Sequence, residues 1–382
     1  MIPLAEPNLS GNEAQYLREC IETTYVSSIG PFVDRFETMV AAAAGAAYGV
    51  AVSSGTTGLH AALTAVGVGR DDLVVLQSLT FIASANAVAH CGATPWLFDV
   101  TDESWTLDPR AVEEALAHQT EERGGQRVHK ASGRRVGAIL PVFTLGMPAD
   151  MDGLCDVAAR YRLPLVADAA AALGARYRAR PVGALGATLT VFSFNGNKTF
   201  TAGGGGVVAG SDAELCARVR HLTTTARCSS EYEHDMVGFN YRMTNLQAAV
   251  GCAQIEKLDS FIAAKRDLAQ RYNEALHDLP GAGLFPSPPW AEGARWLSGV
   301  TLPAQVVRGV LPRLRQAGID CRPFWKPVHM QVPYVGAPHE LLSRCEALWE
   351  TILTLPCSTN LRSEDQQIVI EAMRRCVRED RG

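Results

Sequence analysis

The sequence predicts an α/β protein in which a large domain with a mostly parallel sheet is followed by a smaller α+β domain. From about residue 13 to residue 264, segments with helical spacing alternate with short β-branched runs, which is the pattern of βαβ units. The 382 residues are 47% hydrophobic, which is ample for a sizeable core. A linker rich in proline and glycine, residues 279–289, precedes the tail. We therefore expect a large domain at residues 1–250 and a small domain at residues 251–382 with a long linking helix.

Each element of the large domain follows from a local pattern. Short apolar runs bounded by turn residues predict buried strands at 49–52, 72–76, 137–142 and 163–168. Apolar residues at helical spacing predict helices at 57–66, 83–90, 111–117 and 151–161. Residues 119–135 are polar and contain two turn pairs, so they predict an excursion between a helix and a strand. Residues 244–276 predict one long helix that leads out of the large domain.

Composition excludes several classes of protein. The net charge is -5 and the arginines are scattered, which argues against a nucleic-acid partner. The N-terminus lacks the basic and apolar regions of a signal peptide, and no apolar stretch is long enough to span a membrane, so we expect a cytoplasmic protein. The ten cysteines include no C-x-x-C pair, which favours scattered free thiols over a metal or redox site.

Lysine is scarce, and one lysine stands in a distinctive context. Only five of the 35 basic residues are lysine: Lys130, Lys198, Lys257, Lys265 and Lys326. Lys198 follows Asp168 by about thirty residues and precedes four consecutive glycines, while Asp168 ends a predicted strand, where open α/β sheets bind ligands. A partly desolvated lysine can form a Schiff base with an aldehyde, and pyridoxal phosphate needs an acidic partner for its ring nitrogen. The alternative is that Asp168 caps a helix and that Lys198 is a surface residue.

Two turns favour the cofactor interpretation. The segment Ser53 to His60 is a strand-to-helix turn whose free amides and hydroxyls can bind an anion, although such a turn is more often only a helix cap. In the segment Gln77 to Ala83, Phe81 follows a strand end and can stack on a flat heterocycle, although a core position is the ordinary alternative. Both turns precede Asp168 and Lys198 in the chain.

Together these motifs resemble the DegT/DnrJ/EryC1/StrS family of pyridoxal-phosphate-dependent nucleotide-sugar aminotransferases over nearly the whole chain. Residues 238–249, Gly-Phe-Asn-Tyr-Arg-Met-Thr-Asn-Leu-Gln-Ala-Ala, are similar to a specific signature of that family. The resemblance implies the fold-type-I, aspartate-aminotransferase-like architecture with a mostly parallel seven-stranded sheet flanked by helices. Within the family, residues 25–30, 119–135 and 195–206 are most similar to the LegC-type branch, which aminates C4 of UDP-4-keto-6-deoxy-N-acetylhexosamines.

The resemblance also implies roles for single residues. Lys198 matches the catalytic Schiff-base lysine, Asp168 the partner of the ring nitrogen and Phe81 the stacking ring. Asn240 matches an asparagine that reaches the cofactor of the neighbouring subunit, which implies an obligate homodimer with shared active sites. The phosphate-binding positions match Gly55, Thr56, Thr57 and Ser193, and the substrate-binding positions match Ser27, Ser28, Asn195 and His329, for which an ordinary core or surface histidine is the alternative.

The sequence departs from the family pattern at Ala171 and at residues 203–206, where four glycines replace the common Gly-Glu-Gly-Gly, a change that the LegC-type branch tolerates. Ala171 stands where many members of the family have glutamine or glutamate, so a side-chain hydrogen bond to the phenolic oxygen of the cofactor is missing. Position 198 is lysine and not the histidine of the related sugar dehydratases, which argues against deoxygenation. The carboxylate of the donor needs an arginine, for which Arg227, Arg242 and Arg322 are unranked candidates. Lys257 and Lys265 are expected on a solvated helix face, and the role of residues 119–135 is open.

The expected function is therefore transfer of an amino group from an amino acid, L-glutamate by resemblance, to C4 of a nucleotide-linked 4-keto-6-deoxy sugar of the UDP-N-acetylhexosamine type. One alternative within enzymes is amination at C3 of the sugar or of a keto-inositol. An alternative of another class is a non-catalytic binding or regulatory relative, which the presence of Lys198 argues against and which Ala171 leaves open.

Overall fold

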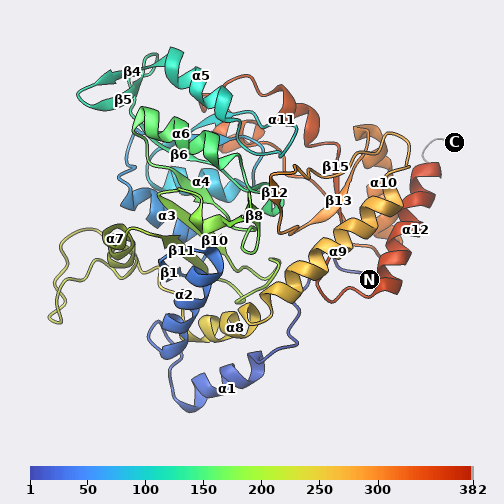
Figure 1. Cartoon of the computed structure of the whole chain (residues 1–382), viewed down its shortest axis with the longest axis horizontal. Helices are drawn as coiled ribbons and strands as arrows, with labels where there is room; N and C mark the ends of the chain where they lie inside the picture. The colour runs from blue at the N-terminus through green and yellow to red at the C-terminus, as the bar shows by residue number, and fades with distance from the viewer. Residues whose placement is uncertain (380–382) are drawn as a thin grey trace.

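A seven-stranded mixed sheet forms the centre of the protein, whose computed structural model describes residues 1–379 (Figure 1). One set of hydrogen-bonded strands has the order β1-β11-β10-β7, and the other has the order β3-β2-β6. Two parallel bridges, Ile139 to Leu165 and Val142 to Asp168, join β6 to β7. The strands are β1 Tyr48–Val52, β2 Leu73–Gln77, β3 Thr94–Phe98, β6 Val136–Leu140, β7 Val166–Asp168, β10 Leu189–Ser193 and β11 Gly206–Gly210. Within this sheet β11 alone runs antiparallel to its neighbours, which confirms the mostly parallel α/β architecture.

Helices cover both faces of the sheet, as expected when strands are apolar on both sides. One apolar cluster packs α2 Pro31–Ala44, α5 Pro109–Gln119, α6 Met151–Tyr161 and α8 Asn245–Ile255 against one face. A second cluster packs α3 Gly55–Ala65, α4 Ile82–His90 and α7 Ala213–Thr223 against the other. The parallel strands therefore end together at one edge, between the two helical layers.

The structure refines two of the expected elements. Residues 244–276 form two helices, α8 and α9 (Leu258–Leu276), and not one, because the Lys257 N–H bonds the Gln254 carbonyl, three residues back, and so leaves the α8 hydrogen-bond ladder. The polar excursion is a β-hairpin of β4 (Thr120–Arg123) and β5 (Gln126–His129). Its two turn residues, Gly124 and Gly125, both have positive φ, which a two-residue hairpin turn requires and glycine supplies without strain.

A smaller sheet lies at the far end of α9 (Figure 1). It has the antiparallel order β13-β15-β14, made of Ser298–Thr301, Ile352–Leu355 and Arg322–Pro323, and an apolar cluster packs it against α9, α10 (Ala304–Gln316) and α12 (Ser363–Glu379). The N-terminal residue Ile2 bridges Ile319, so the start of the chain also lies here. The remaining elements are α1 Glu13–Glu22, α11 Ser343–Leu348, β8 Arg176–Tyr177, β9 Arg180–Pro181, β12 Ala291–Glu292 and four short 3-10 turns.

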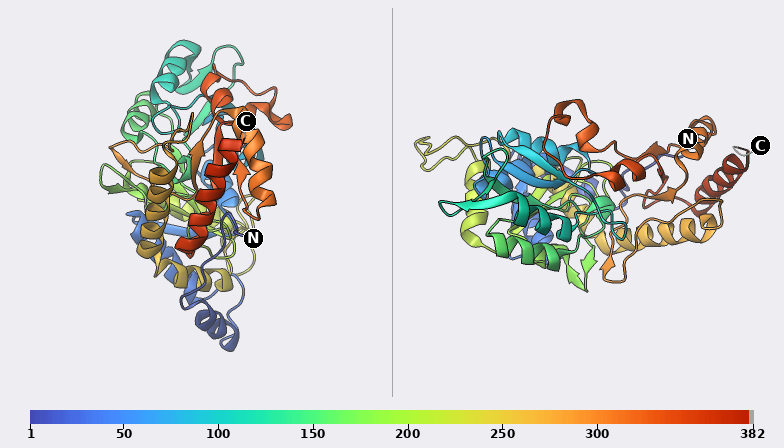
Figure 2. Two further views of the ribbon diagram at one scale, coloured as in Figure 1. Left: turned by 90° about the vertical axis from the view of Figure 1, so that its right-hand side faces the viewer. Right: turned by 90° about the horizontal axis from the view of Figure 1, so that it is seen from above.

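A long connection between α7 and α8, residues 224–244, projects from the body of the protein (Figures 1 and 2). We call it the arm. It carries exposed apolar side chains, with Tyr232 75% and Val237 87% exposed. Among residues 1–379, no helix is long and apolar enough to cross a membrane.

Candidate active site

A cavity of about 550 Å³ opens where the parallel strands of the central sheet end. The large sheet contributes Asp168 from the end of β7 and Ser193 from the end of β10, and Lys198 follows from the loop after β10. Residues 296–297 and 322–325 of the C-terminal part form the opposite wall. The cavity thus lies at the carboxyl edge of the strands, where open α/β sheets bind ligands.

Asp168 is a buried carboxylate with two hydrogen-bond donors. It is 4% exposed; the Ser84 hydroxyl donates to its Oδ2 at 2.6 Å and the Ala170 N–H donates to its Oδ1 at 3.1 Å. Burial raises the pKa of Asp168, while the bond from Ser84, the bond from Ala170 and the charge of Lys198 oppose that rise. The two donors leave further lone pairs of this carboxylate available to a proton-bearing ring nitrogen.

The amine of Lys198 lies in the same cavity. Its Nζ is 3.7 Å from the centre of the Trp296 ring, so the ring face contacts the amine. Burial lowers the pKa of Lys198 to about 8, and the charge of Asp168 acts in the opposite direction. An amine with a lowered pKa is neutral for a larger part of the time near pH 8, which is the form that attacks an aldehyde.

The turn before α3 supplies an anion cradle. Ser54 caps the helix: its hydroxyl accepts the N–H of Thr57, and the Thr57 hydroxyl accepts the N–H of Ser54. The first N–H groups of a helix have no partners inside the helix, so those of Gly55 and Thr56 can bind an anion. A Cβ at Gly55 would lie only 2.7 Å from the Cβ of Ser193, so a side chain there would fill the cradle.

Two aromatic side chains stand at the mouth of the cavity. The Phe81 ring is 54% exposed, and its centre is 5.8 Å from that of Trp325, which comes from the C-terminal part. Asn195 also lines the cavity. An exposed ring beside a cavity that holds a lysine, a carboxylate and an anion cradle is suited to a flat, phosphorylated cofactor.

Five of the expected site residues do not line this cavity. Thr57 is engaged in the helix cap, and Asn240 lies exposed on the arm. Ser27 and Ser28 lie in the connection before α2, where the Ser27 carbonyl accepts the N–H of Asn245. His329 is held in place by its own contacts, since Nδ1 bonds the Ser78 hydroxyl at 2.8 Å and Nε2 lies 3.2 Å from Glu346.

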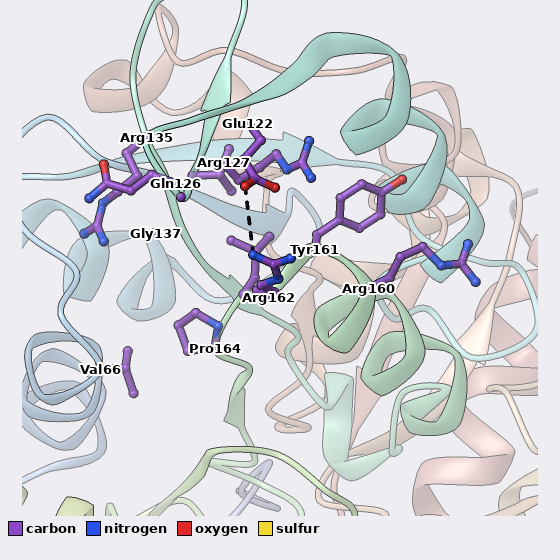
Figure 3. A pocket seen from close by; sticks show the side chains of 13 residues that line it. Val66, Glu122, Gln126, Arg127, Arg135, Gly137, Arg160, Tyr161, Arg162 and Pro164 are labelled. Atoms are coloured by element: carbon purple, nitrogen blue, oxygen red, sulfur yellow. Dashed lines mark ion pairs between the residues drawn. The ribbon is translucent and has the colours of Figure 1, made fainter.

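The hairpin β4–β5 is remote from the cavity. None of its residues lines the cavity; the hairpin covers instead a hollow of about 140 Å³ beside the start of β6 and the end of α6 (Figure 3). The arginines of that hollow do not converge on one point, and each has its own neighbour. Arg135 pairs with Asp72, Arg162 lies 3.9 Å from Glu122, and Arg127 stacks 4.9 Å from the centre of the Tyr161 ring.

Comparison with known proteins shows to which family the chain belongs. The model of the DegT/DnrJ/EryC1/StrS aminotransferase family matches residues 7–374. The chain belongs to this family. It is 37% identical over 385 residues to the GDP-perosamine synthase of Caulobacter vibrioides, and the match covers 97% of each chain. It is 35% identical over 350 residues to the dTDP-3-amino-3,4,6-trideoxy-alpha-D-glucose transaminase of Streptomyces venezuelae, and that match covers 91% of this chain and 87% of the relative. The crystal structure of DesV from S. venezuelae, in complex with a ketimine intermediate, superposes with a TM-score of 0.86 at 33% identity, covering 96% and 94% of the two chains.

Membership makes the protein a pyridoxal-phosphate-dependent aminotransferase that acts on nucleotide sugars, with the fold-type-I architecture. The residues present fit the cofactor. The turn at Gly55, where a Cβ would lie 2.7 Å from the Cβ of Ser193, would hold the phosphate, Asp168 would face the ring nitrogen and Lys198 would bind the aldehyde.

Sequence reasoning missed two residues of this aminotransferase site. Ser84 lies one turn into α4 after Phe81, and a hydroxyl on an otherwise apolar buried helix face was the available signal. Trp296 lies almost one hundred residues after Lys198, in a different part of the fold, and no local pattern points to it. Its Nε1 donates to the carbonyl of Asn197 at 2.6 Å, which fixes the loop that carries Lys198.

Proposed function

We propose that the enzyme transfers the amino group of L-glutamate to C4 of a nucleotide-linked 4-keto-6-deoxy sugar. The observation that carries the proposal is the common cavity of Lys198 and Asp168, because an aminotransferase needs an amine that moves a proton and an anion that keeps the cofactor ring protonated. The bound cofactor supplies an electron sink for the carbon that carries the amine.

The residues of the cavity have distinct tasks in this proposal. Asp168 holds a proton on the ring nitrogen, and Ser84 keeps that carboxylate in position. The Lys198 amine would take the proton from Cα of the donor as a base and would then give it up again as an acid. The turn at Gly55 and Thr56 binds the phosphate through its N–H groups. The same residues act in reverse order when the keto sugar receives the amine.

The site of amination rests on the relatives. The similar protein of Caulobacter vibrioides is named for GDP-perosamine, a C4-amino sugar, which favours C4. The sequence resemblance favours a UDP-linked N-acetylhexosamine as the substrate, whereas the name of the Caulobacter vibrioides protein contains GDP. We therefore propose C4 as the position, with UDP as the nucleotide that the resemblance favours and GDP as its competitor.

Amination at C3 is the second candidate. It is favoured by the 35% identity to a transaminase that is named for a dTDP-3-amino sugar. The keto-inositol reaction and a non-catalytic role have no comparable support; a free keto-inositol is added to the assay below, so that both are among its outcomes.

One assay decides between these candidates. Protein reconstituted with pyridoxal phosphate is incubated with L-glutamate and with 4-keto and 3-keto sugars linked to UDP, GDP or dTDP, and the new amine is located by NMR. We expect product only from 4-keto-6-deoxy sugars, and none with Lys198→Ala protein. Product solely from 3-keto sugars would replace C4 by C3, and wild-type protein that binds the cofactor but aminates no keto substrate would refute the enzymatic proposal.

We further propose that the active enzyme is a homodimer with shared sites. The arm projects from the body and carries exposed apolar side chains, and Asn240 of the arm does not line the cavity of its own subunit. These observations agree with a role in a neighbouring subunit. Exposed apolar surface of this kind is typical of a protein interface.

Complementation tests the shared site. Asn240→Ala and Lys198→Ala proteins should each be inactive or impaired, whereas a mixed dimer would contain one site with both native residues. Mixing the two variants after mild dissociation should recover activity, and sedimentation should give the mass of a dimer. No recovery from verified mixed dimers would contradict the sharing of Asn240.

A further inference from the structure

We infer that Arg322 binds the α-carboxylate of the amino-acid donor, so that the donor connects the small C-terminal sheet with the cofactor side of the cavity. The inference rests on the proposed function, because it concerns the donor of the same reaction. It assigns one of three arginines that the sequence leaves unranked.

The charges of the cavity wall single out Arg322. Among the described residues that line the cavity, the charged ones are Asp168, Lys198 and Arg322. The donor brings a carboxylate bonded directly to the carbon that carries its amine. This carboxylate must therefore enter the cavity together with the amine, and a desolvated carboxylate needs a cationic partner. Lys198 is the reacting amine, which leaves Arg322.

The two other arginines are placed elsewhere. Arg242 donates to the Glu37 carboxylate at 3.0 Å and to the Ala51 carbonyl at 2.8 Å, and its side chain is only 10% exposed. Arg227 lies on the exposed arm, with its guanidinium 5.3 Å from the centre of the Tyr232 ring. Neither side chain lines the cavity of this chain.

Arg322 combines a fixed backbone with a loosely held side chain. Its strand β14 pairs with β15, and the Thr354 hydroxyl donates to the Arg322 carbonyl at 3.0 Å. Within residues 1–379 the guanidinium, in contrast, pairs with the Asp320 carboxylate alone, at 3.5 Å, and the side chain is 64% exposed. Such a surface pair is worth little, whereas two parallel N–H···O bonds to a carboxylate give a stronger and directed contact.

Ring contacts place the Arg322 segment over the reacting amine. Trp296 contacts Lys198 and lies 5.9 Å from Trp325, and Trp325 lies 5.8 Å from Phe81. Residues 322–325 therefore form a cover on the cofactor site. In a sugar nucleotide the diphosphate is separated from the reacting carbon by the sugar ring, whereas the donor carboxylate is directly adjacent to it. A cation that lines the same cavity as Lys198 fits the carboxylate better than the diphosphate.

The first test measures the half-reaction with donor alone. Wild-type, Arg322→Gln, Arg322→Lys and Arg227→Gln proteins are loaded with pyridoxal phosphate, and loss of the visible band is followed after addition of L-glutamate or its α-amide. We expect Arg322→Gln to weaken apparent glutamate binding by about 10- to 150-fold, since a hydrogen bond to a charged group has that worth. Arg322→Lys should recover part of the loss because it keeps the charge, and Arg227→Gln should behave as wild type.

The α-amide separates a direct contact from a general disturbance. Replacing the carboxylate by the amide should cost the wild-type enzyme about as much as Arg322→Gln does, and should cost the Arg322→Gln variant little more. An equal amide penalty in both proteins would overturn the inference. So would unchanged glutamate binding in Arg322→Gln, or a loss that appears in Arg227→Gln instead.

A second readout needs no reaction. Calorimetric titration of the cofactor-free protein with glutarate, which has the carboxylates but no amine, should show weakened binding in Arg322→Gln, while UDP and GDP binding should be retained. Loss of nucleotide binding alone would assign Arg322 to the diphosphate and overturn the inference. If the wild-type protein takes up no amine from any amino acid, the proposed function is refuted. The titration with glutarate would still decide whether Arg322 binds a carboxylate.

Discussion

Replacing Ser84 by alanine removes the hydrogen bond that most strongly opposes the rise of the Asp168 pKa. Burial raises the pKa of Asp168, and the 2.6 Å bond from the Ser84 hydroxyl is the largest influence that opposes it. A hydrogen bond to a charged group is worth about 1.5–3 kcal/mol, so the Ser84→Ala change should raise the pKa of Asp168 further. A carboxylate that is protonated more readily holds the ring nitrogen of the cofactor less firmly.

The cofactor itself reports the change. The dissociation constant of pyridoxal phosphate, measured from the visible absorption band, should rise by about 10-fold or more in Ser84→Ala, with the larger effect at low pH because protonation of Asp168 is then more complete. Ser84→Thr keeps a hydroxyl and should restore most of the affinity. Ser104→Ala removes another buried serine hydroxyl, one that bonds Thr106 outside the cavity, and serves as control. Equal affinities and equal pH dependence in Ser84→Ala and wild type would refute this reasoning.

Three further predictions concern buried charges. Burial lowers the pKa of Lys198 to about 8, so the unfolded chain binds the proton of this amine more tightly than the folded protein does. Lys198→Met should therefore stabilise the cofactor-free protein at pH 7 by up to ~3 kcal/mol. Thermal unfolding should show that this stabilisation becomes smaller as the pH rises above about 8. Glu37→Gln weakens the ion pair with the well-buried Arg242 beside β1, the strand that leads into the turn at Gly55. Chemical unfolding should show a loss of about 2–3 kcal/mol in the free energy of unfolding, and the protein should retain the cofactor less well. Lys265→Met leaves the carbonyls of Trp296 and Cys357 without their donor and should cost about 2 kcal/mol, whereas the matched change Lys257→Met, at a surface contact with Ser10, should stay within ~0.5 kcal/mol.

The cofactor side of the site could be predicted from sequence because strand ends and turns build it. Asp168 ends a strand, Gly55 begins a helix after a strand, and Lys198 follows a third strand within a few residues. Each of these positions has a local signature, and the parallel topology brings the carboxyl ends of the strands together. The seven-stranded sheet and its helical layers follow from the same periodicity.

Other features depend on packing that no local pattern encodes. Lys265 was expected on a solvated helix face, but this expectation is wrong: its side chain is 2% exposed, because α9 packs between the large sheet and the small one. The break between α8 and α9 also escaped prediction, since no proline or glycine marks it. The expected domain boundary at residue 250, and the roles of Ser27, Ser28 and Asn240, stay predictions because they concern domain division or a second subunit.

The buried Lys265 links α9 to the loop that carries Lys198. Its amine donates to the Trp296 carbonyl at 2.8 Å and to the Cys357 carbonyl at 2.5 Å, so it fixes Trp296 from the side of α9. The Trp296 indole in turn donates to the Asn197 carbonyl and contacts the amine of Lys198. A chain of contacts therefore runs from α9 to Lys198. Each contact in this chain involves a backbone carbonyl or a ring face, so the position of Lys198 depends on how the small sheet and α9 pack against the large sheet. A substitution in α9 should therefore shift Lys198 although it contacts no ligand.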